Sequence, residues 1–415
     1  MSIFIFALTI FSILYKPFNL KIWIYSVIGA VLSLSFGFVD SSNLIVIFEL
    51  VWESSLTLIG LIIFSFSLEK LGFFDFVVYK ILYSLSTAKS ELRLRIHTLK
   101  LFIFTLLFCA IFSVIFGNDG AILIVTPIIL KICFSLYKVN KKISLVFLLS
   151  TGFICDSASN ALIISNLTNI IGASFFDISF VEFFKEMFLA NIVSIVSSIL
   201  ISTFIFYKIF PKFLDFKLES KHTESKNITF CFVIILLFLA SFLLNIHIAI
   251  VVCTFGLISL LKVLFTNKNN ALDILKTAPY DILLFSFGLF VVVFGVYNEV
   301  KNEFNEFILE IIKLDLSVVI FGLISAIGAS FLNNLPMVLF GVLGLDSSEA
   351  KNLVYSLLLA CNIGAKLTPI GSLATILWLS ILSKNGVKIS LKDYLIFSLK
   401  ITPFVLLFSL LALNL

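Results

Sequence analysis

Polar residues interrupt the apolar stretches of this sequence at four places, and their side chains are of the kinds that bind and release small solutes. The first cluster, Gly117-Asn118-Asp119-Gly120, lies in the middle of an apolar run that extends from 101 to 130. An ionisable group in hydrocarbon is costly, so a carboxylate there indicates a solute or proton pathway rather than a passive anchor. The same pattern returns at Cys155-Asp156-Ser157, Asn333-Asn334-Leu335-Pro336 and Cys361-Asn362.

We expect these clusters to bind a solute and to transfer protons. Burial disfavours the charged form of a carboxyl group, so Asp156 and Asp119 are expected to load and unload protons. Lys366 is the only strongly basic residue that we place near the middle of the membrane, where we expect it to be a counter-charge to Asp119 or Asp156. Freed backbone and amide groups at helix ends can bind oxygen-rich solutes. The expected solute-binding residues are Asn118, Asp119, Ser165, Asn166, Asn333, Asn334, Asn362, Thr368 and Ser372.

The composition predicts a membrane protein. Hydrophobic residues make up 60% of the 415 residues and charged residues 13%, with a mean hydropathy of +1.18, which excludes a soluble domain of this length. The apolar runs are long enough to cross a bilayer, and they are continuous rather than alternating, which favours helices over a β-barrel. We therefore expect an all-α polytopic protein of the cell inner membrane, in contact with the lipid bilayer. No basic face with interleaved aromatic residues points to a nucleic-acid partner.

The reactive residue types do not predict an enzyme. All six cysteines fall in apolar segments without a C-x-x-C spacing, and the three histidines lie outside the polar clusters. Neither a zinc site, a catalytic triad nor a nucleotide-binding P-loop is therefore indicated, and we expect no cofactor. A polytopic membrane enzyme would need a nucleophile, a metal set or a lipid-phosphate site near the membrane surface, and the polar groups here are expected near its middle.

Loop charges predict a hairpin that enters and leaves the membrane on one side. Basic residues dominate both 80–100 and 131–142, and cytoplasmic loops collect Lys and Arg, so both loops are expected inside. The roughly 30 residues between them give two helical arms of about 22 Å each, enough to pass the middle of the membrane but not to cross it comfortably. The first polar cluster would then lie at the tip of a re-entrant hairpin.

The charge pattern is inverted in the second half of the chain. Acidic residues dominate 299–315 and 346–349, which places the apolar run 316–345 between two outside loops and predicts a second hairpin from the opposite face. The loop 177–186 is also expected outside, and the basic segments 267–280 and 384–392 inside.

Two inverted repeats follow from this topology, each with about five spans, one hairpin and one broken helix. The first repeat is expected at 1–210 and the second at 228–415, joined by a cytoplasmic linker at 211–227. The expected hairpins are 101–131 and 316–345, and the expected broken helices are 143–171 and 353–383.

These residues resemble those of the arsenite/antimonite efflux permeases, or arsenical pump membrane proteins, of the ion-transporter superfamily. The resemblance runs from end to end, and its most specific pieces are Phe116-Gly117-Asn118-Asp119-Gly120-Ala121, Asn333-Asn334-Leu335-Pro336 and Lys366-Leu367-Thr368-Pro369-Ile370-Gly371-Ser372-Leu373-Ala374-Thr375. It implies an antiporter for arsenical resistance, which exports arsenite and antimonite as trihydroxides in exchange for protons by alternating access. It also implies a soluble arsenite-stimulated ATPase as a partner in some members. A homodimer stays open.

The sequence departs from the family pattern at two positions. Asn362 stands where the family usually has an acid, and Ala365 where it usually has a proline, which shifts the expected proton coupling toward Asp119 and Asp156. Cys155 and Cys361 each precede a polar residue, and trivalent arsenic prefers thiolates. A tight thiolate site would trap the solute, however, so oxygen and amide groups are the preferred ligands. A sodium/proton antiporter or an anion carrier of the same superfamily stays open as an alternative function.

Overall fold

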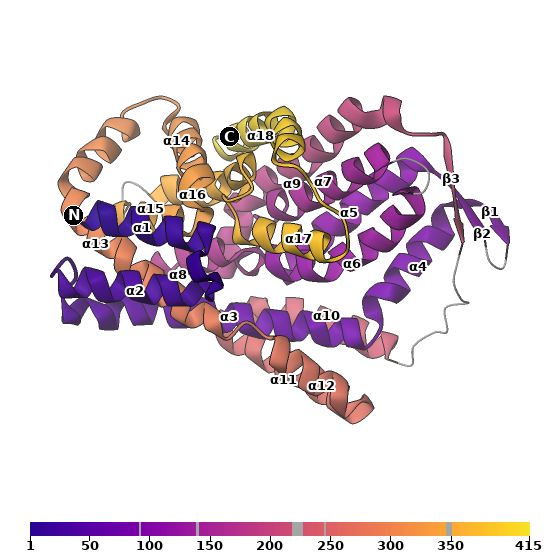
Figure 1. The fold of residues 1–415 in the computed structure, drawn as a ribbon, viewed down its shortest axis with the longest axis horizontal. Coiled ribbons are helices and arrows are strands. Elements are labelled where there is room, and N and C mark those ends of the chain that lie inside the picture. Colours follow the sequence, from indigo (N-terminus) through magenta and orange to yellow (C-terminus); the bar gives the residue numbers. More distant parts are fainter. Residues whose placement is uncertain (91–92, 138–140, 218–226, 245, 346–350) are drawn as a thin grey trace.

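Helices build almost all of the chain in the computed structural model, which describes residues 1–415 without 91–92, 138–140, 218–226, 245 and 346–350 (Figure 1). Six helical segments in the described residues are long and apolar enough to cross a membrane: Ser41–Lys70, Thr98–Phe116, Phe180–Ile209, Ile248–Thr266, Lys268–Ile312 and Leu391–Leu413. Shorter apolar helices accompany them. The prediction of an all-α polytopic membrane protein is therefore confirmed.

The first half of the chain contains α1 (Ser2–Tyr15), α2 (Ile22–Ser35), α3 (Ser41–Lys70), α4 (Phe73–Leu85), α5 (Thr98–Phe116), α6 (Asn118–Tyr137), α7 (Lys141–Ser157), α8 (Leu167–Phe175) and α9 (Phe180–Phe206). The second half contains α10 (Ile228–Ser241), α11 (Ile248–Thr266), α12 (Lys268–Thr277), α13 (Asp281–Ile312), α14 (Ser317–Leu332), α15 (Asn334–Gly344), α16 (Lys351–Gly364), α17 (Leu373–Lys384) and α18 (Leu391–Leu413). The apolar ranges expected to form hairpins and broken helices thus contain most of α5 to α8 and of α14 to α17.

Single residues separate two pairs of consecutive helices, α5 from α6 and α14 from α15, and we call these pairs the first and the second hairpin. Gly117 separates α5 from α6 with φ of 74° and ψ of 155°, and Asn333 separates α14 from α15 with φ of 82° and ψ of 149°. Both residues have a positive φ, which glycine adopts freely and which strains other residues. The Asn333 side chain supports its own turn, because its amide oxygen accepts a hydrogen bond from the Leu335 N–H at 3.3 Å. The two tips therefore share one backbone conformation.

Two further helix pairs are separated by irregular backbone, which is buried throughout in the first pair and partly exposed at Ile370 in the second. Residues 158–166 separate α7 from α8 and include the 3-10 turn Ile163–Ser165, and residues 365–372 separate α16 from α17 and include the turn Ala365–Leu367. Irregular backbone at membrane depth needs hydrogen-bond partners from the protein. The Asn169 amide supplies two of them, since its Nδ2 donates to the Ser159 and Leu162 carbonyls at 2.9 and 3.2 Å.

A small antiparallel sheet lies at the end of the molecule opposite the N-terminus (Figure 1). It contains β1 (Ser86–Ser90), β2 (Arg93–His97) and β3 (Phe213–Lys217) in that order. This sheet was not expected from the sequence. Its third strand occupies part of the range 211–227 that we expected to be a linker, and residues 218–226 of that range lie outside the described residues.

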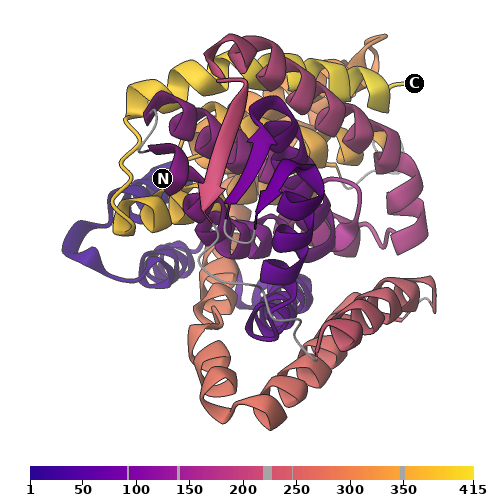
Figure 2. The same cartoon turned by 90° about the vertical axis from the view of Figure 1, so that its right-hand side faces the viewer.

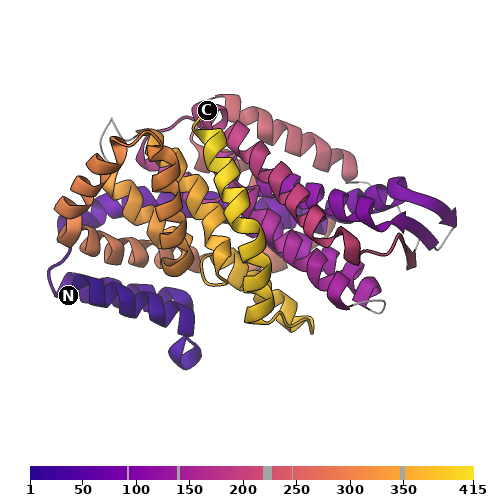
Figure 3. The ribbon, with the colours of Figure 1, turned by 90° about the horizontal axis from the view of Figure 1, so that it is seen from above.

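Helices from the two halves of the chain pack against one another. α3 lies along α11, α13 along α2, and α18 along α9. Seen from above, α18 runs between α9 and α14, and it contacts both (Figure 3). Figure 2 shows α10 to α12 as an arm that projects from the remaining helices. This interleaving brings hairpin tips and helix breaks of both halves together.

Candidate functional site

A small cavity lies where the two hairpin tips meet the two broken helices, and we call it the central cavity. Its volume is about 30 Å³. It is lined by Leu58, Asn118, Asp119, Asn166, Leu167, Thr168, Ile282, Phe285, Asn333, Asn334, Leu335, Ser372 and Ala374. Six of the nine expected solute-binding residues are therefore brought to one cavity: Asn118, Asp119, Asn166, Asn333, Asn334 and Ser372.

Three side chains of the central cavity make no hydrogen bond with the described residues, and each comes from a different element. They are the carboxylate of Asp119 in the first hairpin, the amide of Asn334 in the second and the hydroxyl of Ser372 before α17. Asn334 and Ser372 are buried, with exposed fractions of 7% and 1%. Leaving a buried polar group unpaired costs roughly 1–3 kcal/mol, so unpaired groups around one cavity indicate a polar ligand.

An ion pair stands beside the central cavity and joins the two halves of the chain. The Lys366 ammonium in the second broken helix pairs with Asp156 at the end of α7, and both side chains are at most 3% exposed. The other carboxylate oxygen of Asp156 accepts a hydrogen bond from Asn118 Nδ2 at 2.8 Å, and Lys366 Nζ donates to Thr375 Oγ1 at 2.6 Å. Opposite charges this deeply buried are tolerated only because they are paired and hydrogen-bonded.

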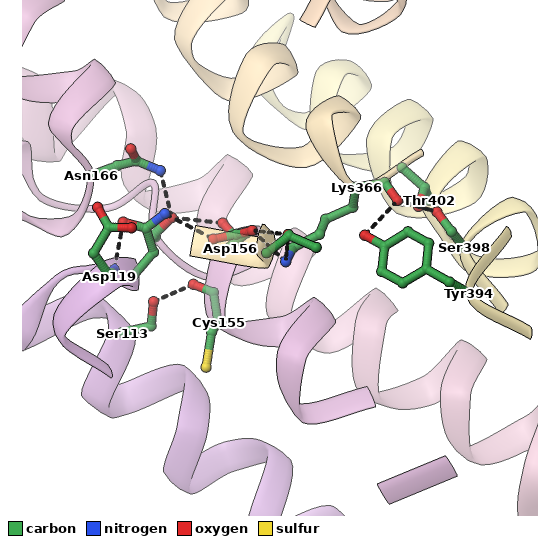
Figure 4. A network of polar contacts seen from close by, with 12 residues as sticks. Ser113, Asp119, Cys155, Asp156, Asn166, Lys366, Tyr394, Ser398 and Thr402 are labelled. Atoms are coloured by element: carbon green, nitrogen blue, oxygen red, sulfur yellow. Dashed lines mark hydrogen bonds and ion pairs between the residues drawn. The ribbon is translucent and has the colours of Figure 1, made fainter. Parts of the chain in front are cut away.

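Helix α18 fixes the backbone that carries Lys366. The Lys366 carbonyl accepts hydrogen bonds from Tyr394 Oη at 3.2 Å and from the Ser398 hydroxyl. Ser398 and Thr402 lie 2.9 Å apart through their hydroxyl oxygens. Figure 4 shows these contacts as one polar network that continues from α18 through Lys366 and Asp156 toward the first hairpin. Helix α18 therefore fixes the position of the Lys366 backbone, from which the ammonium extends to Asp156.

Asn118 holds the tip of the first hairpin while Asp119 stays free of that network. The Asn118 Nδ2 binds Asp156, and its Oδ1 accepts the Asp119 N–H at 2.8 Å, so both ends of the amide are occupied. The Asp119 side chain is partly buried and lies within electrostatic range of Asp156 and Lys366. Two carboxyl groups thus share one ammonium, and Asp119 is the one without a direct partner among the described residues.

Asn362 lies behind the wall of the central cavity and binds the first broken helix. Its Nδ2 donates to the side-chain oxygens of Asn160 and Asn169 at 2.9 and 2.8 Å, and its Oδ1 accepts from Thr168 Oγ1 at 2.6 Å. Thr168 itself lines the cavity. The amide of Asn362 therefore connects the two halves and reaches the cavity only through Thr168.

The other two expected solute-binding residues also use their hydroxyls within the fold. Ser165 donates to the Leu162 carbonyl and accepts the Leu162 N–H at 3.2 Å. Thr368 donates to the Ser330 carbonyl of α14. Neither residue lines the central cavity.

Cys155 and Cys361 are buried away from the central cavity. The Cys361 thiol faces the Ser325 carbonyl at 3.8 Å, and the Cys155 carbonyl accepts a hydrogen bond from Ser113. Within the described residues there is no group of three or more His, Cys, Asp or Glu side chains that could hold a metal ion.

Sequence reasoning missed Thr168 and Thr375. Both are polar residues in the first turn of the helix that follows a break, at positions two after Asn166 and three after Ser372. Their shared place in the first turn after a helix break is the signal that could have identified them.

The chain matches known proteins along its whole length. The family model for arsenical pump membrane proteins matches residues 1–415. An arsenical pump membrane protein of Escherichia coli K12 is 33% identical over 402 residues, covering 93% of this chain and 91% of the relative. The corresponding protein of Yersinia enterocolitica is 32% identical over 403 residues, with the same coverage. A putative arsenical pump membrane protein of Bacillus subtilis is 26% identical over 439 residues, covering 98% of this chain and 97% of the relative.

Proposed function

The chain belongs to the family of arsenical pump membrane proteins, and we propose that it exports arsenite and antimonite from the cytoplasm as trihydroxides, in exchange for protons. The observation that carries this proposal is the central cavity, where a carboxylate, an amide and a hydroxyl from three elements lack hydrogen-bond partners among the described residues. A neutral trihydroxide has hydroxyl groups that donate and accept hydrogen bonds, and it can satisfy all three.

Proton exchange follows from the different surroundings of the two carboxyl groups. Asp156 is paired with Lys366, so it keeps the ammonium buried and the two halves together. Asp119 has no such partner, and an unpaired carboxylate in an apolar interior needs either hydrogen bonds from a ligand or a proton. We assign Asp119 the exchanged proton: hydroxyl groups of the solute solvate its carboxylate, and a proton neutralises it once the solute has left.

Alternating access accounts for the size of the central cavity. About 30 Å³ holds roughly one or two water molecules, which is too little for a trihydroxide. The solute therefore enters only when the helices around the cavity move apart on one side, and it leaves when they move apart on the other. Weak contacts of several polar groups suit such a site, because conduction needs a solute that also leaves.

The basic loops support a cytoplasmic face at the end that carries the sheet. Residues 80–100, which include β1 and β2, and the range 211–227, which includes β3, are both expected inside. On this orientation the chain crosses the inner membrane with its hairpins dipping from opposite faces, as two inverted repeats. A soluble ATPase that docks on the cytoplasmic face and a homodimer stay predictions.

Arsenite uptake into everted membrane vesicles tests the proposal, since export from the cytoplasm becomes accumulation in the vesicle lumen. We expect wild-type vesicles with an acidic lumen to accumulate arsenite and to lose this accumulation when the pH gradient is collapsed. Asp119→Asn should abolish gradient-driven accumulation. Asp315→Asn is the matched control, because Asp315 is exposed in the turn between α13 and α14. Correctly inserted wild-type protein that takes up no arsenite would contradict the proposed function.

A further inference from the structure

A second and much larger cavity, of about 720 Å³, lies at the far end of α8 from the central cavity, and we call it the vestibule. It is bounded by α3, by the end of α8 with the turn into α9, and by the turn before α11. The titratable residues that line it are Glu53, Asp177 and His247. The transport cycle proposed above does not use any of them.

Two helices connect the vestibule to the central cavity. On α3, Glu53 lines the vestibule and Leu58 lines the central cavity, about 7.5 Å further along the helix axis. On α8, Thr168 lines the central cavity and Ser174 lines the vestibule, about 9 Å away. On α8, Ile170 also lines the vestibule and follows Thr168 by only two residues, so a shift of α8 against α3 would join the two spaces.

Glu53 is held at this wall by hydrogen bonds from two other elements. Its Oε1 lies 3.1 Å from His247 Nδ1 in the turn before α11, and its Oε2 accepts a hydrogen bond from Ser174 Oγ at 3.2 Å. The Glu53 side chain is 17% exposed, whereas that of His247 is 75% exposed. Glu53 is thus a mostly buried carboxylate whose exposed part opens into a cavity with room for many water molecules.

The orientation proposed above places the vestibule outside. The loop 177–186 is acidic and is expected outside, and Asp177 belongs to both that loop and the vestibule lining. Helix α7 begins at Lys141 in a loop expected inside, and the broken helix that it starts ends at the vestibule. Protons that enter in exchange for the solute must therefore arrive from this side.

We propose that the vestibule is the outer mouth of the transport path and that Glu53 is its proton acceptor. This inference rests on the proton exchange proposed above. A hydronium ion in the vestibule gives its proton to the Glu53 carboxylate and leaves a water molecule. The protonated Glu53 then passes this proton to the Asp119 carboxylate through water once α8 has shifted, which restores the Glu53 carboxylate. His247 and Ser174 position Glu53, and Asp177 adds a second negative charge to the vestibule.

The test uses everted vesicles, in which the vestibule faces the lumen, and compares wild type with Glu53→Gln and Glu49→Gln. Glutamine can keep both hydrogen bonds of Glu53 but cannot carry the proton. Glu49 is exposed, lies one turn away on the same helix and is not part of the vestibule lining, so it is the matched control. Uptake of arsenite is measured over a series of luminal pH values at one external pH. Exchange of labelled for unlabelled arsenite at equal pH is measured in the same vesicles.

We expect Glu53→Gln to slow gradient-driven uptake by about 100-fold and to remove its dependence on luminal pH, because proton transfer by a positioned group contributes about that factor. Arsenite exchange should stay within twofold of wild type, and Glu49→Gln should match wild type in both assays. Unchanged dependence on luminal pH in Glu53→Gln would overturn the inference, and so would equal loss of uptake and exchange. A wild-type protein whose uptake ignores luminal pH would instead contradict the proposed proton exchange itself.

Discussion

The buried ion pair between Lys366 and Asp156 makes the sharpest prediction about stability. Replacing Lys366 by Met leaves Asp156 as an uncompensated charge in a site where its side chain is 2% exposed. Removing one partner of a buried pair costs about 3–5 kcal/mol, because the remaining charge keeps its desolvation penalty. The double variant K366M/D156N removes both charges, and asparagine can still accept the hydrogen bond from Asn118. We therefore expect it to recover most of the lost stability.

The exposed pair between Lys21 and Asp281 is the matched control for this experiment. Its Nζ and Oδ2 atoms are 2.9 Å apart, and its side chains are 69% and 42% exposed. A pair screened by solvent contributes at most about 1 kcal/mol, so Lys21→Met should be nearly silent. Thermal unfolding in detergent gives the melting temperatures of wild type, K366M, K366M/D156N and Lys21→Met. A loss of stability in K366M as small as that in Lys21→Met would contradict a buried ion pair, and so would a double variant that is no more stable than K366M.

Three further predictions concern the cavity and the network around it. Ser372→Ala removes a hydroxyl without a partner among the described residues, so stability should not fall. The arsenite KM should rise about five- to tenfold, because the solute loses one hydrogen bond. An unchanged KM would show that Ser372 does not contact the solute. Asn362→Asp loses the donors to Asn160 and Asn169 and should lower stability by about 2 kcal/mol in thermal unfolding, unlike Asn385→Asp at an exposed helix end. Gly117→Ala places a methyl group 3.0 Å from Leu61 Cδ2 and 3.2 Å from the Ile164 carbonyl oxygen. It should therefore lower the melting temperature more than Gly37→Ala, because Gly37 shares the positive φ but has open space around it. Equal melting temperatures would contradict the close packing of the hairpin tip.

The polar clusters carried most of the information about where the helices break. Gly117 and Asn333 interrupt apolar runs that are too short to form two spans each, and one helix ends and the next begins at each of those residues. Lys366 was expected to neutralise Asp119 or Asp156, because a lone ammonium in hydrocarbon needs an anion. Which of the two it contacts depends on how the second broken helix packs on α7, and no local pattern encodes that packing.

The sequence was less informative about which polar groups face the cavity. Asn362 and Asn334 are both asparagines in apolar surroundings, yet Asn362 binds three side chains behind the wall and Asn334 faces the cavity. Their difference arises from the rotation of their helices in the assembled fold. The sheet was missed for a related reason: its strands are only five residues long, and β3 pairs with β2 across more than a hundred residues of chain.

Arsenite-driven proton movement in liposomes that contain the purified protein tests the central claim most directly. Arsenite is added outside at equal pH on both sides, and a pH-sensitive dye reports the lumen. We predict that the lumen becomes alkaline with wild type and with Asp315→Asn, as protons leave in exchange for arsenite, and that it does not change with Asp119→Asn or in liposomes without protein. Arsenite influx through the wild-type protein without any change in luminal pH would contradict the proposed exchange.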